Sequence, residues 1–92
     1  MDADEAIGII EREDAGPARR WGNGPGDRYG RHDHPFQKVL FCLSGSIVFH
    51  LDDRDVELRP GDRLDLPAGI AHAATVGPTG CGCVEGARPP DA

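Results

Sequence analysis

Apolar and polar residues alternate with a period of two through most of the chain beyond residue 36. From residue 39 to 43 the odd positions are apolar, whereas the even positions 38 to 42 carry Lys38, Leu40 and Cys42. The alternation resumes at residue 47 and continues in shorter segments. It predicts β-strands over residues 37–43, 47–51, 56–58, 64–66, 72–76 and 81–85, and the apolar run at 6–10 predicts a first strand before them.

Thirteen glycines and eight prolines divide the 92 residues into short segments, so no window offers three uninterrupted helical turns. Turns are expected at Ser44-Gly45 and over 52–55, 59–62 and 67–69. Many short strands separated by turns are typical of an all-β sandwich or barrel. We therefore expect one domain over residues 1–92, with a loop-rich lead-in at 11–31 and a flexible tail at 87–92.

The charge balance is acidic, because 16 Asp and Glu outnumber 10 Lys and Arg, for a net charge of −6 and a pI near 5.0. A phosphate backbone repels such a chain, so nucleic acid is not an expected partner. No apolar run approaches the roughly 18–20 residues that cross a bilayer, so a membrane is not expected either. The acidic N-terminus and the odd count of three cysteines indicate reduced thiols and a cytoplasmic location.

Three histidines are the candidate functional residues. His32 and His34 are two positions apart, so both imidazoles project from one face of an extended chain. His72 opens the strand at 72–76, and if that strand lies beside residues 32–40, the three imidazoles converge in one mouth of the barrel. Three neutral nitrogen ligands that leave coordination positions open are typical of a catalytic metal site, and they suit divalent iron, zinc, nickel or copper.

The spacing around these histidines resembles the two sequence motifs of the cupin family. The first motif has a glycine, His-x-His, a glutamate and a second glycine, and the second has a glycine, Pro-x-Gly, a histidine and an asparagine. The matching positions are Gly26, His32, His34 and Gly45, then Gly61, Pro67, Gly69 and His72. Two positions depart from the motifs: Lys38 stands in place of the glutamate and Val76 in place of the asparagine.

The resemblance implies a single small cupin β-barrel of the jelly-roll kind, with a divalent metal ion in its mouth and frequent homodimers. Carried over residue by residue, His32, His34 and His72 are the metal ligands, and the fourth family ligand is missing. The apolar positions Val39, Phe41 and Leu43 are too hydrophobic for a solvent-facing strand, so we expect this face to form a homodimer contact.

Lys38 has three possible roles, because a protonated amine has no lone pair to give to a metal. It can bind an anionic substrate beside the metal, or act as a neutral base with a lowered pKa. It can also form a structural ion pair with an acid on a neighbouring strand. The two functional roles make Lys38 the candidate catalytic residue.

The remaining candidates have simpler interpretations. Cys42 is expected to be a buried apolar thiol, and Cys81 and Cys83 lack a partner pair for a zinc knuckle. His50 is expected to face solvent. Three aromatic residues flank the first motif and are expected to line the pocket or to pack: Trp21, Tyr29 and Phe36.

Two functions follow from these residues. The first is a metal-dependent enzyme that acts on a small polar or anionic molecule by dioxygenase, isomerase or lyase chemistry. The second is a non-catalytic barrel that binds a small ligand or a metal in a regulatory role. The cupin barrel hosts unrelated chemistries, so the fold does not choose between them.

Overall fold

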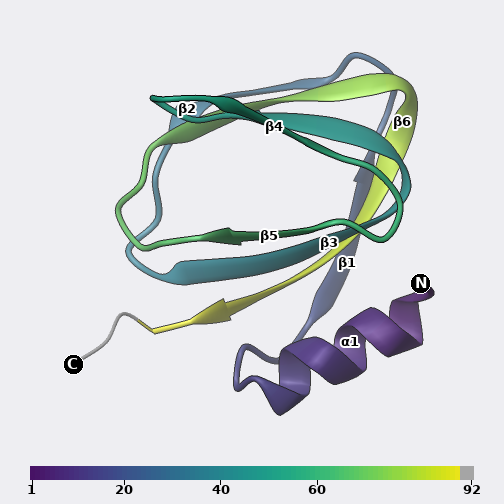
Figure 1. Ribbon diagram of the computed structural model, residues 1–92, viewed down its shortest axis with the longest axis vertical. Coiled ribbons are helices and arrows are strands. Elements are labelled where there is room, and N and C mark those ends of the chain that lie inside the picture. The colour runs from purple at the N-terminus through teal and green to yellow at the C-terminus, as the bar shows by residue number, and fades with distance from the viewer. Residues whose placement is uncertain (90–92) are drawn as a thin grey trace.

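The structure is a computed structural model of the 92-residue chain, and it describes residues 1–89. One helix and six strands make up the fold (Figure 1). Their bounds are α1 Ala3–Arg12, β1 Arg19–Asn23, β2 Arg28–His32, β3 Gln37–His50, β4 Asp55–Leu58, β5 Arg63–Leu66 and β6 His72–Arg88. The tail expected at 87–92 is wrong for residues 87 and 88, which belong to β6, and residues 90–92 lie outside the described residues.

Two long strands, β3 and β6, organise the fold into two antiparallel layers. They pair from Gln37↔Arg88 to His50↔Ala73, and both bend midway so that each strand contributes to both layers. One layer has the order β1-β6-β3-β5, and the other has the order β2-β6-β3-β4 (Figure 1). This arrangement confirms the predicted all-β barrel.

The bend in β3 occurs at the predicted Ser44-Gly45 turn, but the chain does not reverse there. The pairing with β6 shifts between Cys42 and Ser44 and again between Gly45 and Ile47, which marks an irregularity within one continuous strand. Gly45 has a φ of 64°, and a Cβ atom at this position would collide with the carbonyl of Gly80. The segments expected at 72–76 and 81–85 are likewise one strand, β6.

The strand predicted over residues 6–10 is wrong, because these residues lie in helix α1. Asp2 caps the helix by accepting a hydrogen bond from the Glu5 amide at 2.9 Å. Ala6 and Ile10 are four residues apart and share the buried face. Gly8 inside the helix costs about 1 kcal/mol relative to alanine, which tertiary packing of the apolar face offsets. The lead-in at 11–31 is also more regular than expected, since it contains β1 and β2.

Helix α1 packs against the outer face of the layer that contains β1 and β5 (Figure 1). Its contact buries Val39 and Phe41 and partly buries Leu43, the three residues expected to meet a second chain, so the physical reason given for a homodimer is wrong. The helix lies so close to β6 that a Cβ atom on Gly86 would collide with Ile10 and with the carbonyl of Ala15. The buried residues of this contact are Ala6, Ile10, Ala15, Val39, Phe41 and Val84.

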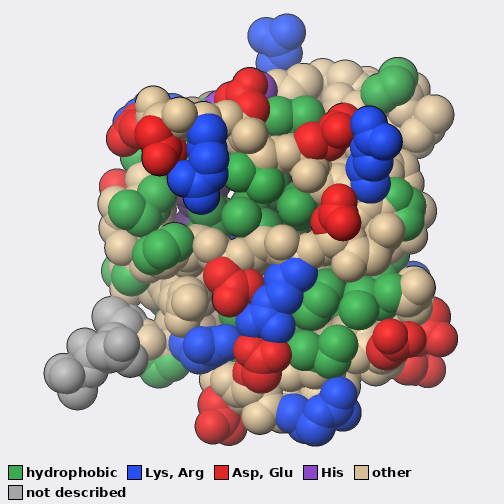
Figure 2. Space-filling view, viewed as in Figure 1, with side chains coloured by type: hydrophobic (Ala, Val, Ile, Leu, Met, Phe, Trp, Pro, Cys, Tyr) green, Lys and Arg blue, Asp and Glu red, His purple; other side chains and the backbone are tan. Residues whose placement is uncertain are grey.

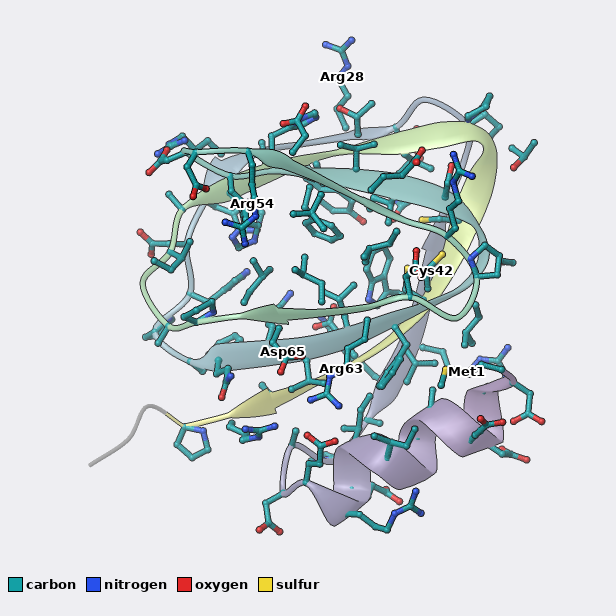
Figure 3. The ribbon with its side chains drawn as sticks, in the orientation of Figure 1. Met1, Arg28, Cys42, Arg54, Arg63 and Asp65 are labelled. Atoms are coloured by element: carbon teal, nitrogen blue, oxygen red, sulfur yellow. The ribbon has the colours of Figure 1, made fainter. Side chains whose placement is uncertain are left out.

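An ion network fixes the end of the helix to the barrel. Arg63 on β5 points toward α1 (Figure 3) and donates hydrogen bonds of 2.7 Å to both carboxylate oxygens of Glu13. Arg88 adds a third bond to Glu13 at 3.1 Å. On the face drawn in Figure 2, cationic and anionic side chains intermix rather than gather in a patch of one sign. Among the described residues, no helix is long and apolar enough to cross a membrane.

Candidate metal centre

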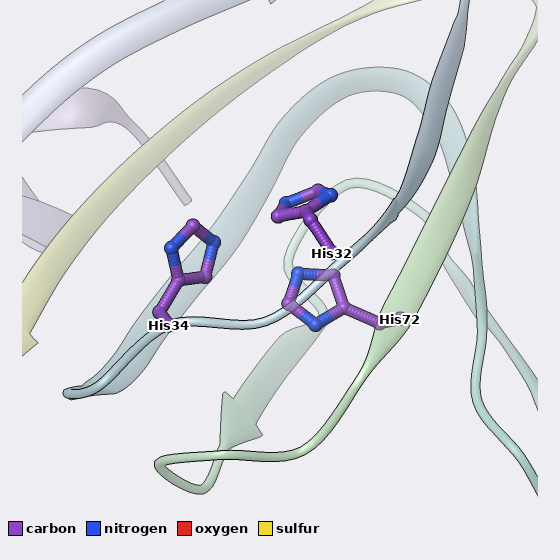
Figure 4. Close-up of side chains that lie close together, drawn as sticks. All are labelled: His32, His34 and His72. Carbon is purple, nitrogen blue, oxygen red and sulfur yellow. The ribbon is translucent and has the colours of Figure 1, made fainter.

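The structure brings the three predicted histidines together at the open end of the barrel (Figure 4). His32 ends β2, His72 begins β6, and the two are register partners where these strands pair. His34 lies in the connection that leads into β3. One ring nitrogen from each histidine lies within 4.8 Å of the other two, and the centroids of the His32 and His72 rings are 4.4 Å apart.

Backbone carbonyls determine which nitrogens face the centre of the cluster. The Nδ1 atom of His32 is 2.6 Å from the Gly30 carbonyl, and that of His72 is 3.0 Å from the Ile70 carbonyl. Because a carbonyl only accepts, both Nδ1 atoms carry the proton and donate it, which leaves each Nε2 with a free lone pair. Such a bond from the second ring nitrogen is the usual way in which a metal-binding histidine is oriented.

The surroundings of His34 and His72 favour their neutral forms. Burial lowers the pKa of His72, and burial together with the nearby charge of Lys38 lowers the pKa of His34. Metal binding needs the neutral form of imidazole, which these shifts favour. The buried Nε2 atom of His34 has no hydrogen-bond partner within residues 1–89. An unpartnered buried nitrogen beside two oriented lone pairs fits a transition-metal ion.

Lys38 points into the barrel, as its parity predicted, and lies against a buried acid. Its Nζ atom is 3.2 Å from Oε2 and 3.4 Å from Oε1 of Glu85 on β6. The Glu85 side chain is buried, with 8% of its surface exposed, and the Lys38 side chain is mostly shielded from solvent, with 15% exposed. The structure thus contains the ion pair that was one of three alternatives for Lys38, and its catalytic role stays a prediction.

Glu85 is the site residue that sequence reasoning missed. It shares the inward face of β6 with the buried Cys81 and Cys83. An acidic residue at an inward position of an otherwise apolar strand could have indicated a buried charge with a partner, because an unpaired charge is rarely buried.

A small cavity lies beside the histidines inside the barrel. Its volume of about 80 Å³ has room for roughly two or three water molecules at about 30 Å³ each. The predicted pocket residues Trp21 and Tyr29 line it, whereas Phe36 instead stacks on His34 with ring centroids 5.0 Å apart. Further lining residues are His32, Phe49, His72 and Glu85.

The other candidate residues lie outside the cluster. Cys42, Cys81 and Cys83 are buried and unpaired within the described part of the chain, and burial raises the pKa of Cys42 and of Cys83. Cys42 is thus the buried thiol that the sequence predicted. Cys42 lies near the end where the two layers converge (Figure 3). His50 is half-exposed rather than fully solvated, and hydrogen bonds at 2.9 and 2.8 Å tie it to Asp55 and Thr75.

Comparison with known proteins agrees with this geometry. A protein-family model described as "Cupin domain" matches residues 21–78. The chain is 36% identical over 53 residues to acireductone dioxygenase 4 of Arabidopsis thaliana, and 36% identical over 49 residues to quercetin 2,3-dioxygenase of Bacillus subtilis strain 168. Each match covers 52% of this chain but only 28% and 14% of those relatives, so the chain spans less than a third of their length.

A solved structure extends the similarity to most of the chain. The DMSP lyase DddQ from Ruegeria pomeroyi DSS-3 superimposes with a TM-score of 0.71 at 26% identity. The match covers 77% of this chain and 36% of the lyase.

Proposed function

This chain belongs to the cupin family, and from that premise we propose that it is a metal-binding cupin in which His32, His34 and His72 hold a divalent ion. The observation that carries the proposal is the geometry of these histidines. Two of them present Nε2 lone pairs fixed by backbone acceptors, and the third presents a buried nitrogen without a partner among residues 1–89. The donor set suits iron, zinc, nickel or copper.

The protein acts on a small polar molecule, by dioxygenase, isomerase or lyase chemistry. When bound, a divalent ion held by three neutral ligands supplies Lewis-acid polarisation of a ligand oxygen. Trp21, Tyr29 and Phe49 line the cavity and exclude water from a molecule held there. The names of the relatives, two dioxygenases and a lyase, support a reaction of this kind.

The second candidate is a non-catalytic module that binds a small ligand or a metal. The observation that favours it is the size of the cavity, about 80 Å³, which is far below the roughly 300–1,000 Å³ of pockets that take drug-sized ligands. A compact ligand is compatible with either the enzyme or the binding module. The two functions are distinguished by whether the protein converts that ligand to a product.

Two finer expectations belong to the proposal. Three unpaired thiols within residues 1–89 are consistent with a cytoplasmic location. A homodimer, if it forms, does not use Val39 and Phe41, because helix α1 covers them. Light scattering at micromolar concentration measures the oligomeric state.

Metal content of the protein purified without an affinity tag or added metal tests the proposal. We expect near one equivalent of one divalent metal, or uptake of one equivalent of added Zn²⁺ or Fe²⁺. His34→Ala and His72→Ala should abolish this binding. His50→Ala is the matched control, because His50 lies outside the cluster, and it should bind as the parent does. A parent protein that refuses every metal, or equal binding by all four proteins, would overturn the proposal.

A further inference from the structure

We infer that Glu85 is part of the metal site, where it neutralises Lys38 and so allows the three histidines to hold a cation beside a buried lysine. The inference rests on the proposed function, because it concerns the same metal ion. It assigns to Glu85 a positioning and charge-compensating role rather than a place among the ligands.

The geometry places the charge pair inside the barrel. Lys38 lies on the inward face of β3, and Glu85 lies on the inward face of β6, where its register partner on β3 is Leu40. Lys38 contacts both carboxylate oxygens of Glu85, at 3.2 and 3.4 Å. Arg19 on β1 reaches Oε2 at 3.3 Å, but its side chain is mostly exposed to solvent. Within residues 1–89, the buried cation that faces Glu85 is therefore Lys38.

The charge of Lys38 matters for the histidine cluster because the two are close. Lys38 contacts Glu85, and Glu85 lines the cavity that His32 and His72 also line. An ammonium group at this range repels a divalent ion even more strongly than it repels a proton. Without a nearby negative charge, the ammonium group of Lys38 would weaken the binding of a metal ion by the three histidines.

Glu85 carries the negative charge that offsets the positive charge of Lys38. It lines the cavity together with His32 and His72, so the ion pair of Lys38 and Glu85 borders the space beside the proposed metal site. Its charge cancels that of Lys38, and the pair presents no net charge to a bound ion. In the protein interior, where the effective dielectric constant is low, this cancellation has a large effect.

Stability alone does not account for the pair. A buried ion pair is often no more stabilising than an apolar pair of similar volume, because desolvation offsets the attraction. The neighbours of Lys38 and Glu85 on the same inward faces, Leu40 and Cys83, show that this part of the barrel accommodates apolar side chains. A charge pair that borders the ligand cavity is thus better explained by a role in the site.

The test is a set of Zn²⁺ titrations by calorimetry at pH 7.5, on the parent protein, Glu85→Gln, Lys38→Met and the double variant. Glu85→Gln leaves Lys38 uncompensated, so we expect its Zn²⁺ affinity to fall about 10- to 100-fold, the range typical of residues that support metal ligands. Lys38→Met leaves a negative charge beside the ion, so its affinity should exceed that of the parent. The double variant removes both charges and should return to within about threefold of the parent.

Opposite effects of the two single substitutions distinguish charge compensation from a structural role, which would weaken binding in both. Glu57→Gln is the matched control, because Glu57 forms an exposed pair with Arg59, and it should bind Zn²⁺ as the parent does. Circular dichroism checks that each variant is folded. If Glu85→Gln does not fold, Lys38→Met is compared with the double variant, which differs from it only at Glu85. We expect Lys38→Met to bind Zn²⁺ more tightly than the double variant, because it keeps the negative charge of Glu85.

The outcomes separate the two proposals. If the parent binds no Zn²⁺ or other divalent metal, the proposed function fails and the inference fails with it. If the parent binds but a folded Glu85→Gln binds equally well, the inference alone is wrong. Equal affinity of Lys38→Met and the double variant would also overturn it.

Discussion

Single residues with special backbone roles hold this site in place. The carbonyls of Gly30 and Ile70 accept hydrogen bonds from His32 and His72, and so select the nitrogens that face the centre of the cluster. At the opposite end of the barrel, Gly45 bends β3 with a positive φ. Neither role depends on side-chain chemistry, yet each determines where functional side chains point.

Gly45→Ala should destabilise the protein. Alanine is strained at a φ of 64°, and its Cβ would collide with the Gly80 carbonyl, so we expect a loss of about 2–4 kcal/mol in the free energy of unfolding. Gly30→Ala is the control, because nothing lies within 4 Å of a Cβ built at that position. Urea unfolding measures the stability of both variants. Equal stability would contradict the requirement for glycine at the bend in β3.

Glu13 should make stability depend on pH in the acid range. The hydrogen bonds from Arg63 lower the pKa of Glu13 below its ordinary value of 4.5. A lowered folded-state pKa contributes stability above the unfolded-state value, and this contribution is lost as the pH falls from about 4.5 through the folded-state value.

Thermal unfolding of the parent and of Glu13→Gln between pH 7 and pH 3 tests the role of Glu13. The parent should be more stable at pH 7, and the difference should shrink toward zero at pH 3. Glu57→Gln, at an exposed site, should track the parent across the range. A difference that stays constant with pH would refute the assignment.

The residues of the site divide into those that sequence predicts and one that it does not. His32, His34 and His72 follow from local spacing, because strand parity and a motif of fixed register apply within short segments. The partnership of Lys38 with Glu85 joins positions 47 residues apart. No local pattern specifies which strands become neighbours, so parity predicts that both side chains face inward but not that they meet.

At the level of elements, helix α1 covers the face of the sheet that contains Val39 and Phe41, which the sequence predicted to be exposed. Its sequence, with Gly8 in the middle and three isoleucines nearby, is ambiguous between helix and strand over so short a length. The cap at Asp2 and the apolar surface of β3 and β6 favour the helix. The same surface, seen in sequence as exposed, predicted a dimer. Both the strand expected at 6–10 and the dimer face were wrong for one reason: local sequence does not show that residues 3–12 form a helix that covers Val39 and Phe41.

Ile10→Ala should loosen the helix from the barrel. Ile10 is fully buried against β3 and β6, so truncation should cost about 2–4 kcal/mol of unfolding free energy. Ile70→Ala makes the same chemical change at an exposed position and should cost less than about 0.5 kcal/mol. Similar losses in the two variants, measured by urea unfolding, would mean that the helix contact contributes little.

At the scale of the whole molecule, the proposed metal ion ties together separate parts of the open end. His32 and His72 come from paired strands, and His34 comes from the connection into β3. An ion bound to all three restrains the mouth of the barrel, and it binds the folded state alone. Binding of this kind stabilises a protein by mass action.

Zn²⁺ should therefore raise the midpoint of thermal unfolding. At 100-fold excess over the dissociation constant the gain is about 2.7 kcal/mol, which for a domain of this size corresponds to roughly 10–20 °C. A chelator should reverse the shift, and His72→Ala should show none. An equal shift in His72→Ala would indicate that Zn²⁺ binds elsewhere.

The pairing of β3 with β6 also has a consequence for the order of events during biosynthesis. Gln37 and Arg88, at one end of this pairing, are 51 positions apart, and contacts of such long range form slowly because a large loop must close first. His72 meets His32 only when β6 has been synthesised and has docked beside β2. The emerging chain thus has no assembled histidine triad, so the proposed metal ion would bind to a barrel that has already folded.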